Sequence, residues 1–260
     1  MLAEAVKRYL SEHKELADLE IVDLGVGPLY SYSKLETGSV GLFYSFLEEY
    51  NGPPLRLEEL LASPRVRELV EFAWSSNMVE RVLLFASLNA LGQYVLRDVE
   101  LEAKSAQEVL AELLEGVRAR SVAVVGHMRP LVEELRELGL KIYVFERDPS
   151  KRRGEALSDV FEELLLPKAD AVVLTGSALA LPTLDRVLEL CKRASLKAIV
   201  GPSASAPPDF LVDLGFDLIG GCLVRDGERA AKMVMLGAGF KTLKRAGLLE
   251  EYVLLRESKS

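Results

Sequence analysis

Short apolar runs separated by helical segments constrain the fold of this chain more than any other feature. A nearly continuous apolar strand is typical of a parallel sheet that is buried on both faces. Because helical patterns alternate with these runs, we predict a Rossmann-like, doubly wound α/β domain over residues 105–260. The five predicted strands are Ser121–Val125, Lys141–Phe145, Asp170–Leu174, Leu196–Val200 and Phe216–Ile219.

The first part of the chain has a different pattern, in which strands come first and helices follow. Leu19–Leu24, Leu29–Lys34 and Ser39–Tyr44 are short strand candidates that together predict an antiparallel meander. The strongest helix pattern covers Asn77–Leu96, with Asn77 as its N-cap, and weaker helices are predicted at 2–16, 57–62 and 63–73. We therefore predict a small α+β domain over residues 1–98, with a domain boundary in the polar connection at 98–104.

Composition and charge exclude several classes of function. The 260 residues are 49% hydrophobic and 28% charged, with a formal net charge of −8, which is typical of a soluble globular protein without the footprint of a nucleic-acid binder. No apolar stretch is long enough to span a bilayer, and the N-terminus lacks a signal-peptide pattern. We expect a cytoplasmic protein without nucleic-acid or membrane partners, and the sequence leaves homodimerisation open. Cys191 and Cys222 are predicted to be buried free thiols.

The loops that follow the predicted strands bring glycine and hydroxyl residues to one edge of the sheet. Ligands of open parallel sheets bind beyond the carboxyl ends of the strands, where these loops converge. A single loop of this kind would be an ordinary turn, whereas four at consecutive strand ends favour a ligand site. With Thr183 and with Asn89, a polar residue in an apolar helix, the predicted ligand-binding residues are Gly126, His127, Glu146, Thr175, Gly176, Ser177, Thr183, Gly201, Pro202, Ser203, Gly220 and Asn89.

The loop residues point to several classes of ligand. Glu146 lies 20 residues beyond Gly126, the spacing at which dinucleotide folds place an acid for the ribose, but the second and third glycines of that fingerprint are absent. His127 and Glu146 are candidate metal ligands, although no second histidine or cysteine is placed to join them. Glycine and hydroxyl loops suit a carboxylate or phosphate. No nucleophile motif is present, so the sequence does not decide whether the protein is an enzyme.

Three isolated residues of the N-terminal part also carry expectations. The Asn89 amide needs hydrogen-bond partners if it is buried, and either the other domain or a ligand could supply them. Trp74 and Tyr44 are predicted to pack in the core or between the domains.

Several motifs resemble a known family. Thr175–Leu179, Thr183-Leu184, Gly201–Ser203 and Gly215–Gly221 are similar to the heavy-metal chelation domain family, formerly a domain of unknown function. Asn77–Leu83 and Ala86–Ala90 resemble its companion N-terminal domain. The resemblance implies a small domain similar to the N-terminal domain of enolase, a Rossmann-like second domain and a cleft between them. The chain departs from the family pattern at Leu181-Pro182, where that pattern has an asparagine.

The leading hypothesis is that a small anionic ligand or a metal chelate binds in the interdomain cleft. Thr175–Ser177 and Gly201–Ser203 would hold it, and the N-terminal domain would cover it. One alternative is an enzyme, such as a transferase, that uses a nucleoside cofactor like S-adenosylmethionine or a nucleotide. A second alternative is a structural or interaction protein whose loops are ordinary turns.

Overall fold

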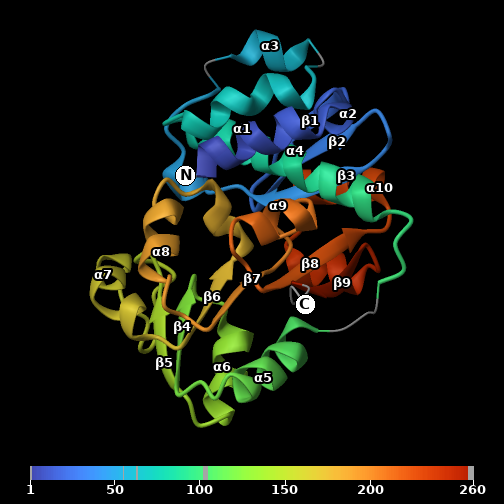
Figure 1. The fold of residues 1–260 in the computed structure, drawn as a ribbon. Helices are drawn as coiled ribbons and strands as arrows, with labels where there is room; N and C mark the ends of the chain where they lie inside the picture. Colours follow the sequence, from blue (N-terminus) through green and yellow to red (C-terminus); the bar gives the residue numbers. More distant parts are fainter. Residues whose placement is uncertain (1, 55, 63, 102–104, 257–260) are drawn as a thin grey trace.

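A computed structural model describes residues 2–54, 56–62, 64–101 and 105–256 of the chain (Figure 1). It contains a three-stranded antiparallel sheet of order β1-β2-β3 and a six-stranded sheet of order β5-β4-β6-β7-β8-β9. Strands β4 to β8 run parallel, and only β9 is antiparallel to its neighbour. The chain therefore has the mixed α/β fold that was predicted, with one parallel-rich sheet and one small antiparallel sheet.

The N-terminal part forms the meander and helices that its pattern predicts, with two differences. The first helix ends at Glu12, and the helix predicted at 63–73 is a 3-10 helix that begins at Val66; Ser63, its predicted N-cap, lies outside the described residues. The elements are α1 (Leu2–Glu12), α2 (Lys14–Ala17), β1 (Ile21–Val26), β2 (Tyr30–Leu35), β3 (Val40–Tyr44), η1 (Leu47–Glu49), α3 (Leu57–Leu61), η2 (Val66–Trp74) and α4 (Met78–Leu96).

Helix α4 joins the two parts of the molecule. Asn77 caps it as predicted, accepting hydrogen bonds from the N–H groups of Val79 and Glu80. All of its residues except Tyr94 and Val95 are buried, because β2 and β3 pack on one side and the loops of the large sheet on the other. A Cβ at Gly92 would lie 1.9 Å from the Ser205 carbonyl oxygen, so only glycine permits this approach. One apolar core consequently runs through both parts.

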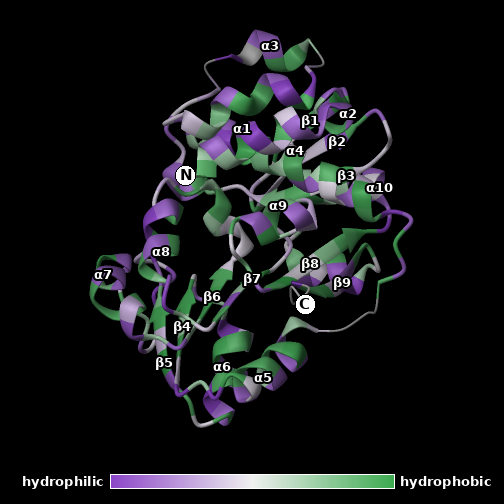
Figure 2. Cartoon of the chain, viewed as in Figure 1, coloured by the Kyte–Doolittle hydropathy of each residue, from purple (hydrophilic) through white to green (hydrophobic). Residues whose placement is uncertain are grey.

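The C-terminal part alternates strands and helices, and all five predicted strands are present. Helices α5 and α6 pack on one face of the large sheet, while α8 and α9 pack on the other, so the parallel strands are mostly apolar (Figure 2). The elements are α5 (Ala106–Gly116), β4 (Ser121–Val125), α6 (Arg129–Glu137), β5 (Lys141–Phe145), η3 (Asp159–Phe161), α7 (Glu162–Leu165), η4 (Leu166–Lys168), β6 (Ala171–Thr175), η5 (Gly176–Ala180), α8 (Leu184–Leu190), β7 (Leu196–Val200), α9 (Pro208–Asp213), β8 (Leu218–Val224), α10 (Gly227–Met235), α11 (Phe240–Arg245) and β9 (Leu249–Leu255).

The end of the C-terminal part differs from the prediction. Gly220 and Gly221, expected just after the fifth strand, lie inside β8. The pair does not break the strand because β9, which was not predicted, hydrogen-bonds along it, and because neighbours approach closely: a Cβ at Gly220 would lie 2.6 Å from the Ala106 Cβ. Helix α11 was not predicted either. Cys191 and Cys222 are buried and unpaired, as expected, and burial raises the pKa of each thiol to about 12.

The strand order fixes where a ligand site can form. The chain leaves β4 toward β5 on one side and returns to β6 on the other, so the loops after β4 and β6 diverge from neighbouring strand ends. This is a topological switch point, the usual place for a ligand in an open parallel sheet.

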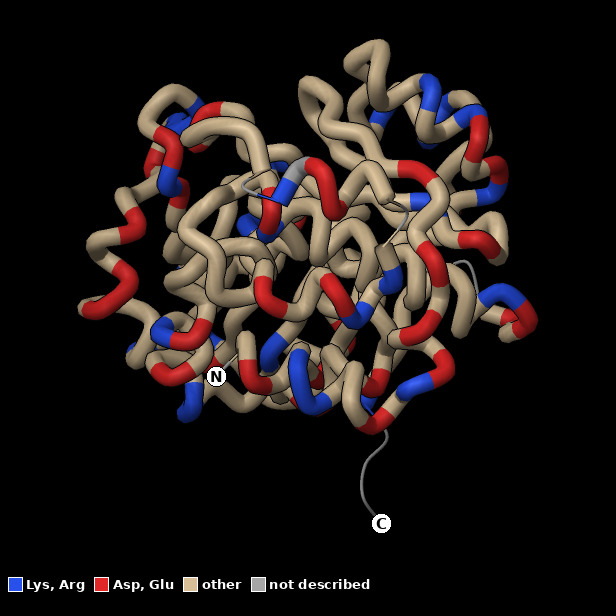
Figure 3. Tube along the Cα trace, turned by 90° about the horizontal axis from the view of Figure 1, so that it is seen from above, with Lys and Arg blue, Asp and Glu red and all other residues tan. Residues whose placement is uncertain are grey.

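Over the described ranges, no helix combines the length and apolar character needed to cross a bilayer. Figure 3 shows acidic and basic positions interspersed in a view turned by 90° from Figure 1.

Candidate functional site

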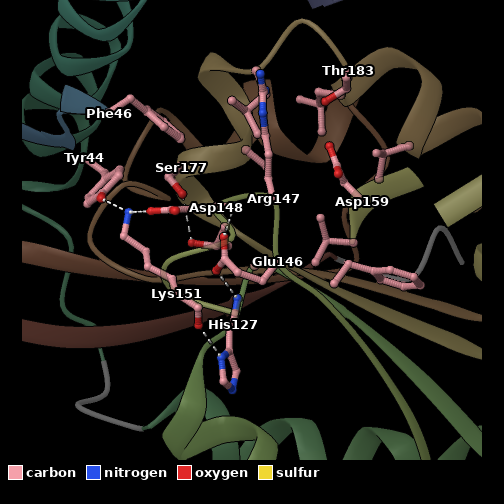
Figure 4. Close-up of a pocket in the computed structure, with 18 of the residues that line it drawn as sticks. Tyr44, Phe46, His127, Glu146, Arg147, Asp148, Lys151, Asp159, Ser177 and Thr183 are labelled. Atoms are coloured by element: carbon pink, nitrogen blue, oxygen red, sulfur yellow. Dashed lines mark hydrogen bonds and ion pairs between the residues drawn. The ribbon is translucent and has the colours of Figure 1, made fainter. Parts of the chain in front are cut away.

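A cavity of 250 Å³ lies beside the switch point, between the β3–η1 segment and the loops that follow β4, β5 and β6 (Figure 4). Part of its lining is apolar: Phe46, Val125, Met128, Phe145, Ala178, Leu181, Leu184 and Val187. Its charged lining consists of Glu48, Glu49, Glu146, Asp148, Asp159 and Glu162, with the basic residues Arg147 and Lys151. We call it the acidic cavity, because carboxylates outnumber basic groups in its lining.

Ion pairs cross this cavity and join the two parts of the chain. The Lys151 ammonium lies 2.5 Å from Glu48 Oε1 and donates to the Tyr44 hydroxyl at 2.6 Å (Figure 4). It also lies 3.0 Å from an Asp148 carboxylate oxygen. The Arg147 guanidinium pairs with Glu49 at 2.9 Å. Both basic residues are therefore already neutralised, and the remaining carboxylates give the cavity an excess of negative charge.

The carboxylates of the cavity differ in their affinity for protons. Burial raises the pKa of the Glu162 carboxyl to about 7, and the neighbouring Asp159 carboxylate adds to this rise while Arg147 opposes it. Burial also raises the pKa of Glu49. Hydrogen bonds from Ser150 and Lys151 lower the pKa of Asp148 to about 2. Among the carboxyl groups of the cavity, the charge of Glu162 thus changes near neutral pH.

The predicted metal ligands His127 and Glu146 lie close together but have other partners. The Glu146 carboxylate accepts the main-chain N–H of His127 at 3.2 Å and that of Asp148 at 2.9 Å. The His127 Nδ1 atom lies 3.3 Å from the Lys151 carbonyl oxygen. Within the part of the chain that the structure describes, no three or more His, Cys, Asp or Glu side chains are grouped to hold a metal ion. A metal at this site would need ligands from another molecule.

A second, larger cavity of 710 Å³ lies next to the acidic cavity, among α5, α6, α11 and the ends of β7 and β8. His127, Met128 and Thr175 line both cavities and so separate them. We call the larger one the glycine-rich cleft, after the lining residues Gly201, Gly220, Gly221, Gly237 and Gly239.

The predicted site residues are divided between the two cavities. Six of them line the acidic cavity: Gly126, His127, Glu146, Thr175, Ser177 and Thr183. His127 and Thr175 also line the glycine-rich cleft, where they are joined by Gly201, Pro202 and Gly220. The convergence of the loops on one edge of the sheet is thus observed, but the edge holds two adjoining cavities instead of one.

Three predicted residues line neither cavity. A Cβ at Gly176 would lie 2.3 Å from the Ala204 nitrogen, so this glycine serves close packing. The buried Ser203 hydroxyl accepts the Tyr44 N–H at 3.0 Å. Asn89, for which we expected a partner from the other domain or a ligand, instead donates to the Leu42 carbonyl of β3 at 2.7 Å, and its Oδ1 atom has no hydrogen-bond partner among the residues that the structure describes. These three residues support the fold around the site.

Sequence reasoning missed the residues that give the acidic cavity its charge. Glu48 and Glu49 come from the N-terminal part, and Asp159 and Glu162 come from the η3–α7 segment, far from any predicted motif. The one available signal was the charged run at 146–153 directly after a predicted strand. Tyr44 contacts both parts of the chain through the hydrogen bond from Lys151, which agrees with its predicted place between the domains. Trp74, which was also predicted to be packed, is 46% exposed.

The fold and the site together define a mixed α/β protein in which two cavities adjoin the switch point of a parallel-rich sheet. Two family models, both described as "Putative heavy-metal chelation", match residues 9–92 and 109–252. An uncharacterized protein of Methanocaldococcus jannaschii is 35% identical over 238 residues, which cover 88% of this chain and 89% of the relative. The chain belongs to the heavy-metal chelation family that these models describe.

Solved structures agree with this assignment. The crystal structure of a protein of unknown function from the DUF364 family of Pyrococcus horikoshii has a TM-score of 0.84 and 29% sequence identity, covering 98% of this chain and all (100%) of the other. A DUF364 family protein from Desulfitobacterium hafniense, at 22% identity, has a TM-score of 0.76 over 95% of this chain and 98% of its own, and shares the fold.

Proposed function

We propose that the acidic cavity binds a small metal chelate that is positively charged and has a partly apolar body. The observation that carries the proposal is a lining in which carboxylates surround an apolar surface without forming a protein metal centre. A chelate brings its own metal ligands, so the protein needs only to complement its charge and shape. The family description of heavy-metal chelation supports the same class of ligand.

The charge of the cavity favours this ligand over a free anion. Lys151 and Arg147 are each held by carboxylates, so an anion would meet the remaining acidic groups without a free basic partner. The repulsion between an anionic group and one carboxylate costs on the order of 1 to 4 kcal/mol at about 4 Å, depending on exposure to water. The charge of the acidic cavity therefore supports a metal chelate as its ligand. A small anion, the other ligand class of the leading hypothesis, has better support in the glycine-rich cleft.

The apolar lining indicates what surrounds the metal. Leu181, one of the two residues that stand where the family pattern has an asparagine, lines the cavity together with Leu184 and Phe46. These side chains would contact the hydrocarbon part of a chelator, whose burial contributes roughly 25 cal/mol per Å². A hydrated metal ion has no such surface to bury.

The proposal keeps the Rossmann-like and enolase-like descriptions of the two parts, and places the ligand between them.

A nucleoside cofactor has less support. The Glu146 carboxylate, the candidate acid for a ribose, already accepts two main-chain N–H groups. No other contact among the described residues favours S-adenosylmethionine or a nucleotide over a chelate, and homodimerisation plays no part in the proposal.

Two exchange-inert cobalt(III) chelates of opposite charge provide the test. We expect tris(ethylenediamine)cobalt(III), a tripositive chelate with hydrocarbon arms, to bind in isothermal titration calorimetry. The singly negative EDTA complex and cobalt(II) chloride should bind much more weakly. Glu162→Gln should weaken binding of the cation, whereas Glu163→Gln, which alters the neighbouring carboxylate that pairs with Arg186, should not. Equal binding of the two chelates, or equal effects of the two substitutions, would contradict the proposal.

A further inference from the structure

We propose that the glycine-rich cleft is a second binding site, which takes an organic anion with an apolar body. It lies on the α5–α6 side of the large sheet, and the loops after β4 and β6 separate it from the acidic cavity. At 710 Å³ it falls within the range of cofactor and small-molecule sites, which is roughly 300–1,000 Å³. The inference does not rest on the ligand proposed for the acidic cavity.

The charge of the cleft is opposite to that of the acidic cavity. Lys241 lines the cleft and forms no ion pair within 4 Å among the described residues, although its charge reaches the Glu133 carboxylate. Arg129 lines it as well, and its one acidic partner is Glu133 on the next turn of α6. Among the described residues, the only carboxylate in the lining is that of Glu251, which pairs with Lys244. The described lining therefore has one cation outside any ion pair and no unpaired carboxylate, which favours an anion.

The main chain on one side of the cleft is open to a ligand. Gly201 has a φ of +110°, which favours glycine, and no atom lies within 4 Å of the position that a Cβ would take. The adjacent Pro202 has no N–H group and also lines the cleft. A ligand can thus approach this loop without displacing a side chain. By contrast, a Cβ at Gly220 would meet Ala106, so that glycine serves the packing of α5.

The remaining lining is mostly apolar and would hold the body of the ligand. Leu110 and Leu131 reach it from α5 and α6, and Phe240 reaches it from α11. Leu29, in the β1–β2 turn, lines the cleft and is 43% exposed. Exposure of this apolar side chain to water costs free energy, which an apolar ligand would recover by covering it. Helix α6 begins at the cleft with Arg129 and has no side-chain cap, so the positive end of its dipole adds to the field of Lys241.

A pair of fluorescent probes that differ in charge tests the proposal on the full chain. The probes are 8-anilinonaphthalene-1-sulfonate and N-phenyl-1-naphthylamine, which share an aromatic body, but only the first carries a sulfonate. We expect saturable binding of the sulfonate at one site per chain, and about tenfold weakening by Lys241→Met, the loss expected for one partly exposed ion pair. Binding of the neutral probe should change little. Lys232→Met, on α10 and outside both cavities, is the matched control.

A second variant tests the place of binding without changing charge. Thr242→Trp puts a large side chain into the cleft from α11 and should abolish binding of both probes, while the melting temperature, measured by circular dichroism, shows that the variant folds. The proposal is overturned if the wild type shows no saturable sulfonate binding, if Lys241→Met and Lys232→Met behave alike, or if folded Thr242→Trp binds as before. Glu162→Gln should leave sulfonate binding unchanged, so failure here is distinct from failure of the chelate proposal.

Discussion

The acidic cavity and the glycine-rich cleft share His127, Met128 and Thr175 yet present opposite charges. Both form at the carboxyl ends of parallel strands and share the loop after β4 and the end of β6. Their difference comes from what covers those ends. The β3–η1 segment and α7 supply carboxylates on one side, while α6 and α11 supply basic residues on the other. A switch point thus provides the position of a site, and the covering segments decide its chemistry.

The largest expected effect comes from filling one cavity at a time. Thr183→Trp introduces a large side chain at the acidic cavity and should abolish binding of tris(ethylenediamine)cobalt(III), because the ligand and the indole cannot occupy the same space. Thr242→Trp should abolish binding of the sulfonate probe and leave binding of the chelate unchanged. Calorimetry and fluorescence titration of both variants with both ligands measure this double dissociation. If either variant removed both ligands, the two cavities would have to be treated as one site.

A smaller effect should follow from removing the cation that neutralises the acidic cavity. Lys151→Met frees Glu48 and Asp148, so the cationic chelate should bind about tenfold more tightly, an effect of roughly 1.4 kcal/mol. The same substitution at Lys241 should leave this affinity unchanged. Weaker chelate binding in a folded Lys151→Met protein would argue that the lysine contacts the ligand directly.

Stability offers a third comparison, since only the acidic cavity contains a carboxyl with a strongly raised pKa among the lining residues described. The pKa of Glu162 is about 7 in the folded protein and 4.5 in its ordinary state. The folded state therefore binds more protons between these values, and stability falls as pH rises through this window and is level above it. Glu162→Gln should raise the free energy of unfolding at about pH 8 by ~1 kcal/mol, after allowance for partial exposure, and should change little at about pH 4. Urea denaturation at the two pH values checks the sign, with Glu163→Gln as the control that lacks the gain.

The smallest expected effect is the pH dependence of chelate binding. As Glu162 ionises around its pKa of about 7, the cavity gains negative charge and the cationic chelate should bind about threefold more tightly at pH 8 than at pH 6. Glu162→Gln should flatten this dependence. A wild-type affinity that does not change with pH would show that the charge of Glu162 does not act on the bound chelate.

Much of the fold could be predicted because buried strands consist mainly of apolar residues, and such runs can be recognised in the sequence. The strands from Ser121–Val125 to Leu196–Val200 are mostly apolar, with Lys141 and Lys197 as the charged exceptions, and Asn77 has the side chain that a helix N-cap requires. Prediction was less accurate where neighbours decide the outcome. The Gly220-Gly221 pair has the local character of a turn, but pairing with β9 and the approach of α5 keep it within β8.

The candidate site was predictable in position but not in composition. Glycine and hydroxyl residues at consecutive strand ends indicated the switch point, because parallel strands bring their carboxyl ends to one edge whatever the rest of the chain does. Asn89 was misplaced because an amide in an apolar helix has the same local pattern whether it faces a ligand or, as here, the main chain of β3.

The sequence by itself determined the alternation of strands and helices through Leu196–Val200, the buried thiols and the edge of the sheet at which the polar loops converge. These follow from local polarity and from the geometry of parallel strands. Only the tertiary structure decided that this edge holds two cavities, and that Glu48 and Glu49 lie across from Arg147 and Lys151. Charges from segments so far apart in the chain combine through space, and no local pattern records which of them will meet.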